Sequence, residues 1–298
     1  MHLRLVSILS LAMLIVLACM GSGVLQAAES QRNFVVFFEF LDNSSGAEDA
    51  LTYIFNDMLG PDDQLIIYSP ARLYSFSKTT LARPKADLIA MMKEKLRGDI
   101  SQAAQNYKQV IKDMESIVRI IETSVLEIGP ADPGDELNLR NLFMRYKQSF
   151  GDLQQLRKIN EAALRQIAGL FRNQRGQNHM VLLFEREFRP VPSGEALNKL
   201  RELPIFAMQA NELFASDNLK PPFNADVIGE LFKQAPLTFH FLYVKSNSNF
   251  SSGATFENSG DIYAAFSKIA KNTGGICDTI AEPVAGLKTI MAALKEAK

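Results

Sequence analysis

The chain has 298 residues, with 32 Lys and Arg against 33 Asp and Glu, and a formal net charge of −1. A hydrophobic fraction of 47% and a charged fraction of 22% are typical of a folded globular protein and exclude a largely disordered one. The balanced charge argues against a nucleic-acid partner, and two cysteines exclude a disulfide framework.

The first 28 residues have the pattern of an export signal. Arg4 gives a positive start, residues 5–18 are apolar except for Ser7 and Ser10, and small residues lead to a cleavage point near Ala27 or Ala28. We therefore expect a domain over 29–298 in the periplasm, at the cell surface or secreted. The alternative is a lipoprotein signal ending at Cys19, and either that or an uncleaved signal would attach the protein to a membrane.

Alternating strand and helix patterns occupy the rest of the chain. Strands are predicted at residues 33–40, 64–68, 72–77, 179–188, 237–244 and 276–280. Helices are predicted at residues 47–59, 84–96, 194–214, 225–234, 262–272 and 283–297. The helix over 84–96 is expected to end at Gly98 and Asp99, and residues 245–260 are expected to form a loop rich in Ser, Asn and Gly.

A different pattern over residues 100–175 predicts a long helical hairpin. Apolar residues repeat at spacings of three and four from Ile100 to Ile128, which is a heptad seam typical of a coiled coil. A Pro/Gly turn follows, and a second helix is predicted over 135–171. The hairpin is either a packed scaffold or an arm that binds a partner.

The order of elements predicts an α/β fold with three αβα layers. The sheet is expected to be doubly wound, six-stranded and mostly parallel, with one antiparallel edge strand and the helical hairpin as an insertion. This order resembles the von Willebrand factor A domain over residues 33–297. The resemblance rests on the strand before the Asp42-Asn43-Ser44-Ser45-Gly46 loop, on residues 59–63, and on residues 262–275.

The resemblance implies a site for Mg²⁺ or another divalent cation at the carboxyl ends of the strands. The family pattern is Asp-x-Ser-x-Ser after the first strand, then a Thr, then an Asp after the fourth strand. Asp42 and Ser44 match its first element, whereas Gly46 replaces the last Ser. The position of the family's Thr falls near Asp99 and Ser101 in this sequence, and the position of its second Asp falls near Glu185 and Glu187. The candidate binding residues are Asp42, Ser44, Asp99, Ser101 and Glu185, with Asp42 and Ser44 as the metal ligands. The alternative is that Asp42 and Ser44 only form a turn and that Glu185 and Glu187 are solvated.

The sequence contains only partial matches to the motifs of known enzyme classes. Residues 75–78 (Ser-Phe-Ser-Lys), 216–218 (Ser-Asp-Asn) and 271–274 (Lys-Asn-Thr-Gly) resemble the three motifs of penicillin-recognising serine hydrolases. The nucleophile of that class begins a buried helix, whereas Ser75 falls in a predicted strand, so Ser75 and Lys78 are not expected to act together. His179 and His240 lack zinc-site spacing.

We therefore expect no catalysis and no certain cofactor. The sequence favours an exported adhesion or scaffold module that binds a protein partner through the carboxyl edge of the sheet or through the hairpin. The alternatives are a metal-independent envelope assembly factor and, least favoured, the serine hydrolase.

Overall fold

The computed structural model describes residues 31–41, 45–128, 133–157, 159–214, 219–245 and 253–296. The predicted export signal over 1–28, including Cys19, and the predicted ligands Asp42 and Ser44 lie outside the described residues. None of the described helices is long and apolar enough to cross a membrane.

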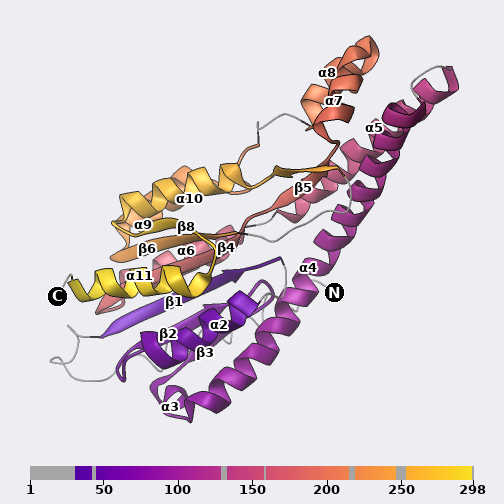
Figure 1. The fold of residues 1–298 in the computed structure, drawn as a ribbon. Helices are drawn as coiled ribbons and strands as arrows, with labels where there is room; N and C mark the ends of the chain where they lie inside the picture. Colours follow the sequence, from indigo (N-terminus) through magenta and orange to yellow (C-terminus); the bar gives the residue numbers. More distant parts are fainter. Residues whose placement is uncertain are drawn as a thin grey trace, which may run out of the picture.

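A six-stranded sheet forms the centre of the molecule (Figure 1). Its strands are β1 (Arg32–Glu39), β2 (Gln64–Tyr68), β3 (Leu73–Phe76), β4 (Gln177–Glu185), β6 (Leu237–Val244) and β8 (Cys277–Ile280). Their order is β3-β2-β1-β4-β6-β8, and every pair is parallel except β2 with β3. The predicted α/β sheet with one antiparallel edge strand is confirmed.

Each face of the sheet is covered by helices because the central strands are apolar on both faces. In β1, Phe34, Val36 and Phe38 enter one core, and Val35 and Phe37 enter the other. The first core is covered by α2 (Ser45–Tyr53), η1 (Ile54–Met58), the beginning of α4 (Lys85–Thr123) and α11 (Pro283–Glu296). The second is covered by α6 (Glu161–Arg172), α9 (Ala225–Gln234) and α10 (Gly260–Asn272). A short helix, α3 (Lys78–Leu81), joins β3 to α4.

A second body, which we call the arm, extends from the sheet and has its own core (Figure 1). It consists of the part of α4 after Ile100, η2 (Ser124–Ile128), α5 (Pro133–Leu156), α7 (Gly194–Glu202), α8 (Pro204–Phe214), and a small antiparallel sheet of β5 (Phe188–Val191) and β7 (Ala254–Glu257). The predicted seam positions Met114, Ile117 and Ile121 are buried in this core. The long helical insertion is therefore confirmed, and it packs with helices from elsewhere in the chain.

Three predicted boundaries were wrong. The break at Gly98 and Asp99 does not occur, because α4 runs unbroken for 39 residues. One glycine costs a helix only about 1 kcal/mol, and burial of the flanking Leu96 and Ile100 outweighs that cost. The second hairpin helix is divided into α5 and α6, where the Asn160 side chain caps α6 by accepting from the Ala163 N–H. The predicted loop over 245–260 contains β7.

Candidate functional site

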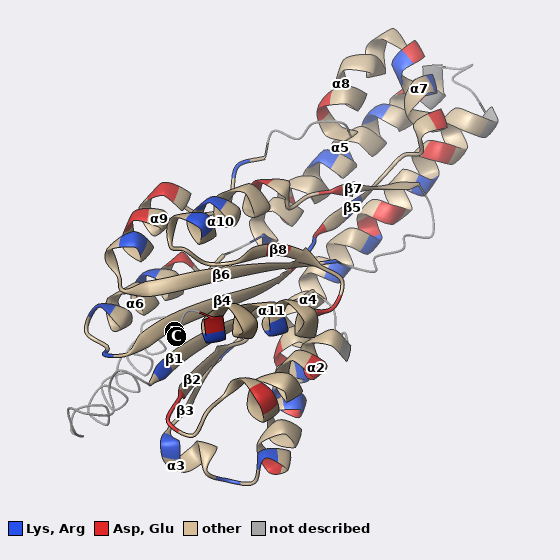
Figure 2. Cartoon of the chain, turned by 60° about the vertical axis from the view of Figure 1, so that its left-hand side comes forward, with Lys and Arg blue, Asp and Glu red and all other residues tan. Residues whose placement is uncertain are grey.

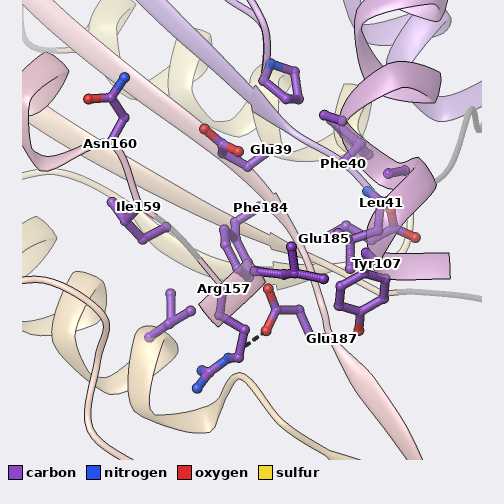
Figure 3. A pocket seen from close by; sticks show the side chains of 15 residues that line it. Glu39, Phe40, Leu41, Tyr107, Arg157, Ile159, Asn160, Phe184, Glu185 and Glu187 are labelled. Atoms are coloured by element: carbon purple, nitrogen blue, oxygen red, sulfur yellow. Dashed lines mark hydrogen bonds and ion pairs between the residues drawn. The ribbon is translucent and has the colours of Figure 1, made fainter. Parts of the chain in front are cut away.

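The carboxyl ends of β1, β4 and β6 lie at one edge of the sheet, because these strands are parallel. A cavity of about 220 Å³ lies at this edge, between the strand ends and the base of the arm (Figure 3). Three glutamates from the strand ends line it: Glu39, Glu185 and Glu187. Tyr107 from α4 and Arg157, which follows α5, also line it.

Glu187 and Arg157 form a buried ion pair in this cavity. Arg157 Nε donates to Glu187 Oε2 at 2.8 Å, and Arg157 Nη2 donates to Asp261 Oδ1 at the start of α10. Burial raises the pKa of Glu187 to about 7, although the charge of Arg157 opposes this shift. Burial, and next the charge of Glu187, raise the pKa of Glu39 to about 8. Glu39 is therefore mostly protonated at neutral pH and is poor at binding a cation.

Glu185 holds the loop that leads to the predicted metal ligands. Its Oε2 accepts the Leu41 N–H at 2.8 Å, and its side chain is buried. The alternative in which Glu185 and Glu187 are solvated was wrong, since both are at most 6% exposed. Sequence reasoning placed them at a strand end but missed that the arm covers this edge.

Asp99 and Ser101 lie on α4 and do not line the cavity. Asp99 is buried, and its Oδ2 accepts from the Ser69 hydroxyl and from the Tyr74 hydroxyl at 2.6 Å each. It therefore ties α4 to the β2–β3 hairpin. Ser101 is exposed. The structure thus places Glu185 in the cavity and the other two described candidates outside it.

The described residues do not bring three His, Cys, Asp or Glu side chains close enough together to hold a metal ion. Two of the carboxylates at the carboxyl edge already accept hydrogen bonds, Glu185 from Leu41 and Glu187 from Arg157. A hard divalent cation needs several oxygen ligands, and these bonds occupy one oxygen of each of the two carboxylates.

The base of the arm is fixed by a second buried arginine, Arg189 of β5, which is 1% exposed. Its Nη1 donates to the Tyr146 hydroxyl at 2.9 Å and to the Leu213 carbonyl at 2.6 Å. Its guanidinium lies over the rings of Phe150 and Phe256, 4.5 and 4.7 Å from their centroids. This one side chain therefore contacts α5, α8 and β7, and it anchors all three elements to β5.

Exposed apolar side chains gather on the arm. Among the described residues, every exposed large apolar side chain except Leu73 belongs to α4, α5 or α8. Four of them form what we call the apolar face of the arm, with their exposed fractions: Leu137 (61%), Met144 (64%), Ile205 (48%) and Met208 (76%).

The two halves of the apolar face lie on adjoining helices. α5 packs on α8 through the rings of Phe143 and Phe214, whose centroids are 5.5 Å apart. Lys147 and Glu212 pair across the same two helices at 3.9 Å. Met144 lies one turn before Lys147 in α5, and Met208 lies one turn before Glu212 in α8. Residues three or four apart share one face of a helix, so each methionine lies on the same helix face as a member of this ion pair. Glu212 is the only charged residue of α8, and Figure 2 shows that helix largely free of charge.

The hydrolase motifs are not assembled. Ser75 lies in edge strand β3, opposite Ile66. The segment 271–274 ends α10, where Thr273 Oγ1 accepts the Phe239 N–H of β6. Four strand spacings separate β3 from β6, which is roughly 19 Å at about 4.8 Å each. The segment 216–218 lies outside the described residues.

Comparisons with known proteins identify no family. No family model matches the chain, and no curated protein matches it. Among solved structures, the N-terminal domain of TFIIH p34 is similar over 89% of this chain and 97% of that chain, with 12% sequence identity and a TM-score of 0.27. A likeness at this level supports no argument about function.

Proposed function

We propose that the chain is a protein-binding module, similar to a von Willebrand factor A domain, that binds its partner through the apolar face of the arm. The observation that carries this proposal is the concentration of exposed large apolar side chains on α5 and α8. Apolar side chains gathered on one part of a surface are costly to expose to water, and such surfaces commonly mark a protein interface.

The arm suits this role because it is held rigidly. Its own buried core and the contacts of Arg189 fix α5 and α8 to the small β5–β7 sheet. The Arg157 ion pairs with Glu187 and Asp261 connect that unit to the main sheet. A preorganised surface loses less conformational entropy on association than a flexible one.

The partner surface that fits is an apolar helix face with flanking charges of both signs. α8 offers apolar side chains with one charge, and Lys147 and Glu212 border the methionines. Methionine side chains adapt their shape to the surface that they contact, which favours packing against a helix. Binding by this route needs no metal ion. The predicted export signal over 1–28 would place the protein outside the cytoplasm.

Site-specific crosslinking in the host cell tests the proposal. A photo-crosslinking amino acid at position 208 is expected to capture one protein reproducibly. The same amino acid at position 73 is the control, because Leu73 is an exposed apolar residue on the opposite part of the molecule, in β3. Met144→Lys in the same chain should abolish the crosslink at 208. Equal capture from both positions, or a crosslink that survives Met144→Lys, would refute the proposal.

A further inference from the structure

A stripe of uncharged residues runs along the solvent side of α5. Its six members are spaced alternately by four and three residues, and all are exposed: Leu137, Asn141, Met144, Gln148, Gly151 and Gln155. The opposite side of the helix is buried in the arm core, through Leu139, Tyr146 and Leu153. The alternating spacing is that of a heptad repeat, so the six residues share one face of the helix. We call this face the α5 stripe.

No other element of the described chain covers the α5 stripe. Leu137 and Met144 are 61% and 64% exposed, whereas the solvent side of an amphipathic helix usually carries charged and polar side chains. A Cβ added to Gly151 would meet nothing within 4 Å, so a second helix has room to approach α5 closely there. An uncharged face with heptad spacing is typical of a helix that packs against another helix.

Charged residues border the α5 stripe on both flanks. On one flank Lys147 pairs with Glu212 of α8, so this flank adjoins a helix of the same chain. On the other flank Arg145 and Asp152 are exposed, lie seven residues apart and form no ion pair within the described part of the chain. Two opposite charges, one heptad apart, are therefore available to a partner on this open flank.

The order of these charges fits a second copy of the same helix. Two helices that pack antiparallel bring the same flank of each helix together. With a two-fold axis near Gln148, Arg145 of one copy lies opposite Asp152 of the other, and the symmetry repeats this pair. The same arrangement places Met144 of each copy near Gly151 of the other, where no side chain blocks it. The stripe is therefore complementary to itself in charge and in size.

We propose that two copies of this chain associate through the α5 stripe, antiparallel, with a two-fold axis near Gln148. The three amide side chains of the stripe fix the register, as polar residues in a helical seam commonly do, and they make the association weaker than that of an apolar seam. This inference rests on the function proposed above, because the stripe shares Leu137 and Met144 with the apolar face of the arm. It identifies the partner as a second copy of the chain.

Sedimentation equilibrium of the purified chain measures the association directly. Over concentrations from about 1 to about 300 μM we expect a monomer–dimer equilibrium with a Kd in the micromolar range, because the stripe is narrow and half of its residues carry amides. A chain that remains monomeric at about 300 μM would overturn the inference.

A charge swap tests the pairing of the two helices. Arg145→Asp and Asp152→Arg should each raise the dimer Kd about 10-fold, because each change turns two attractive pairs into two repulsive ones. The double variant should return to within about 2-fold of the wild type, since the pairs then form with their signs exchanged. Residues seven apart in one helix do not pair with each other, so this rescue requires a second copy. Asp49→Arg, on an exposed aspartate of α2, is the matched control and should leave the Kd unchanged. A double variant without rescue, or an equal loss in Asp49→Arg, would overturn the proposal.

The position of the two-fold axis predicts a disulfide. Gln148→Cys in a Cys19→Ser, Cys277→Ser background should form a covalent dimer under mild oxidation, because a residue beside a two-fold axis lies close to its own counterpart. Leu73→Cys in the same background is the control, since Leu73 is exposed and lies in β3. Equal yields of covalent dimer from the two positions would overturn the proposed axis.

Failure of this inference can be distinguished from failure of the proposed function. A monomeric chain whose position 208 captures a different protein would exclude the second copy and leave the proposed function standing. A monomeric chain with no specific capture from position 208 would contradict both. A dimer that shows the charge-swap rescue supports the inference.

Discussion

Replacing Glu39 by Gln should stabilise the protein increasingly as the pH rises. The pKa of Glu39 is raised from 4.5 to about 8 by burial and by the charge of Glu187. The folded state therefore holds a proton that the unfolded state releases above pH 4.5. The stability that this proton contributes is fully present below pH 4.5 and is lost as the pH rises to about 8.

The size of the effect follows from the shift. Each pKa unit corresponds to about 1.36 kcal/mol, so at pH 7.5 the wild type should have lost about 3–4 kcal/mol that a neutral Gln retains. Urea unfolding of the wild type and of Glu39→Gln at pH 5, 6, 7 and 8 measures this difference. Glu230→Gln, on an exposed glutamate of α9, is the control and should follow the wild type at every pH. If Glu39→Gln differed from the wild type by the same amount at pH 5 and pH 8, burial of Glu39 at the base of the arm would be refuted.

Three further predictions concern the arm, a tight turn and the metal question. Arg189→Ala should lower the free energy of unfolding by about 3–5 kcal/mol in urea titrations, because it removes a large buried side chain and leaves a cavity among its partners. Arg165→Ala, which breaks a surface pair on α6, should cost no more than about 0.5 kcal/mol, and equal costs would contradict the anchoring role. Gly275→Ala should cost at least about 3 kcal/mol, since its Cβ would lie 1.8 Å from the Phe239 carbonyl oxygen, and a Tm equal to that of the wild type would show that the turn is wrongly placed. Millimolar Mg²⁺ should leave the Tm unchanged, whereas a rise of more than about 2 °C that EDTA reverses would show that the folded protein binds a cation.

The central strands could be predicted from the sequence because they are buried on both faces. The sequences of β1, β4 and β6 are nearly continuous apolar runs. Such runs are typical of parallel strands that are covered by helices on both faces. The short link between β2 and β3 predicted the antiparallel edge strand correctly. The sheet therefore depends on local patterns that are visible along the chain.

The arm could be predicted only in part, because its packing joins distant segments. The heptad seam predicted a long helix, but six of the 17 buried residues of the arm core come from β5, α7 and α8. β5 and β7 are four residues each, and β5 contains Pro190, so neither has a strand pattern. Arg189 gives no local sign of burial, because its aromatic partners Phe150 and Phe256 lie far away in the sequence.

The candidate residues at the carboxyl edge were chosen because they occupy the positions of the metal-site pattern of the von Willebrand factor A domain, which the sequence resembles. Position alone could not show that Asp99 is used to tie α4 to Ser69 and Tyr74. It also could not show that Glu185 is engaged by a backbone N–H. Sequence reasoning also could not show that His179 and His240 lie side by side, because they become neighbours only when β4 and β6 pair.

Binding of the crosslinked partner to defined variants tests the role of the arm most directly. The partner captured from position 208 is purified, and its Kd is measured for the wild type, for Met144→Lys with Met208→Glu, and for Leu73→Lys. Loss of buried apolar contacts at the centre of an interface predicts at least a ~10-fold rise in Kd for the double variant and no change for Leu73→Lys. Unchanged affinity of a folded double variant, or an equal loss in Leu73→Lys, would contradict the account.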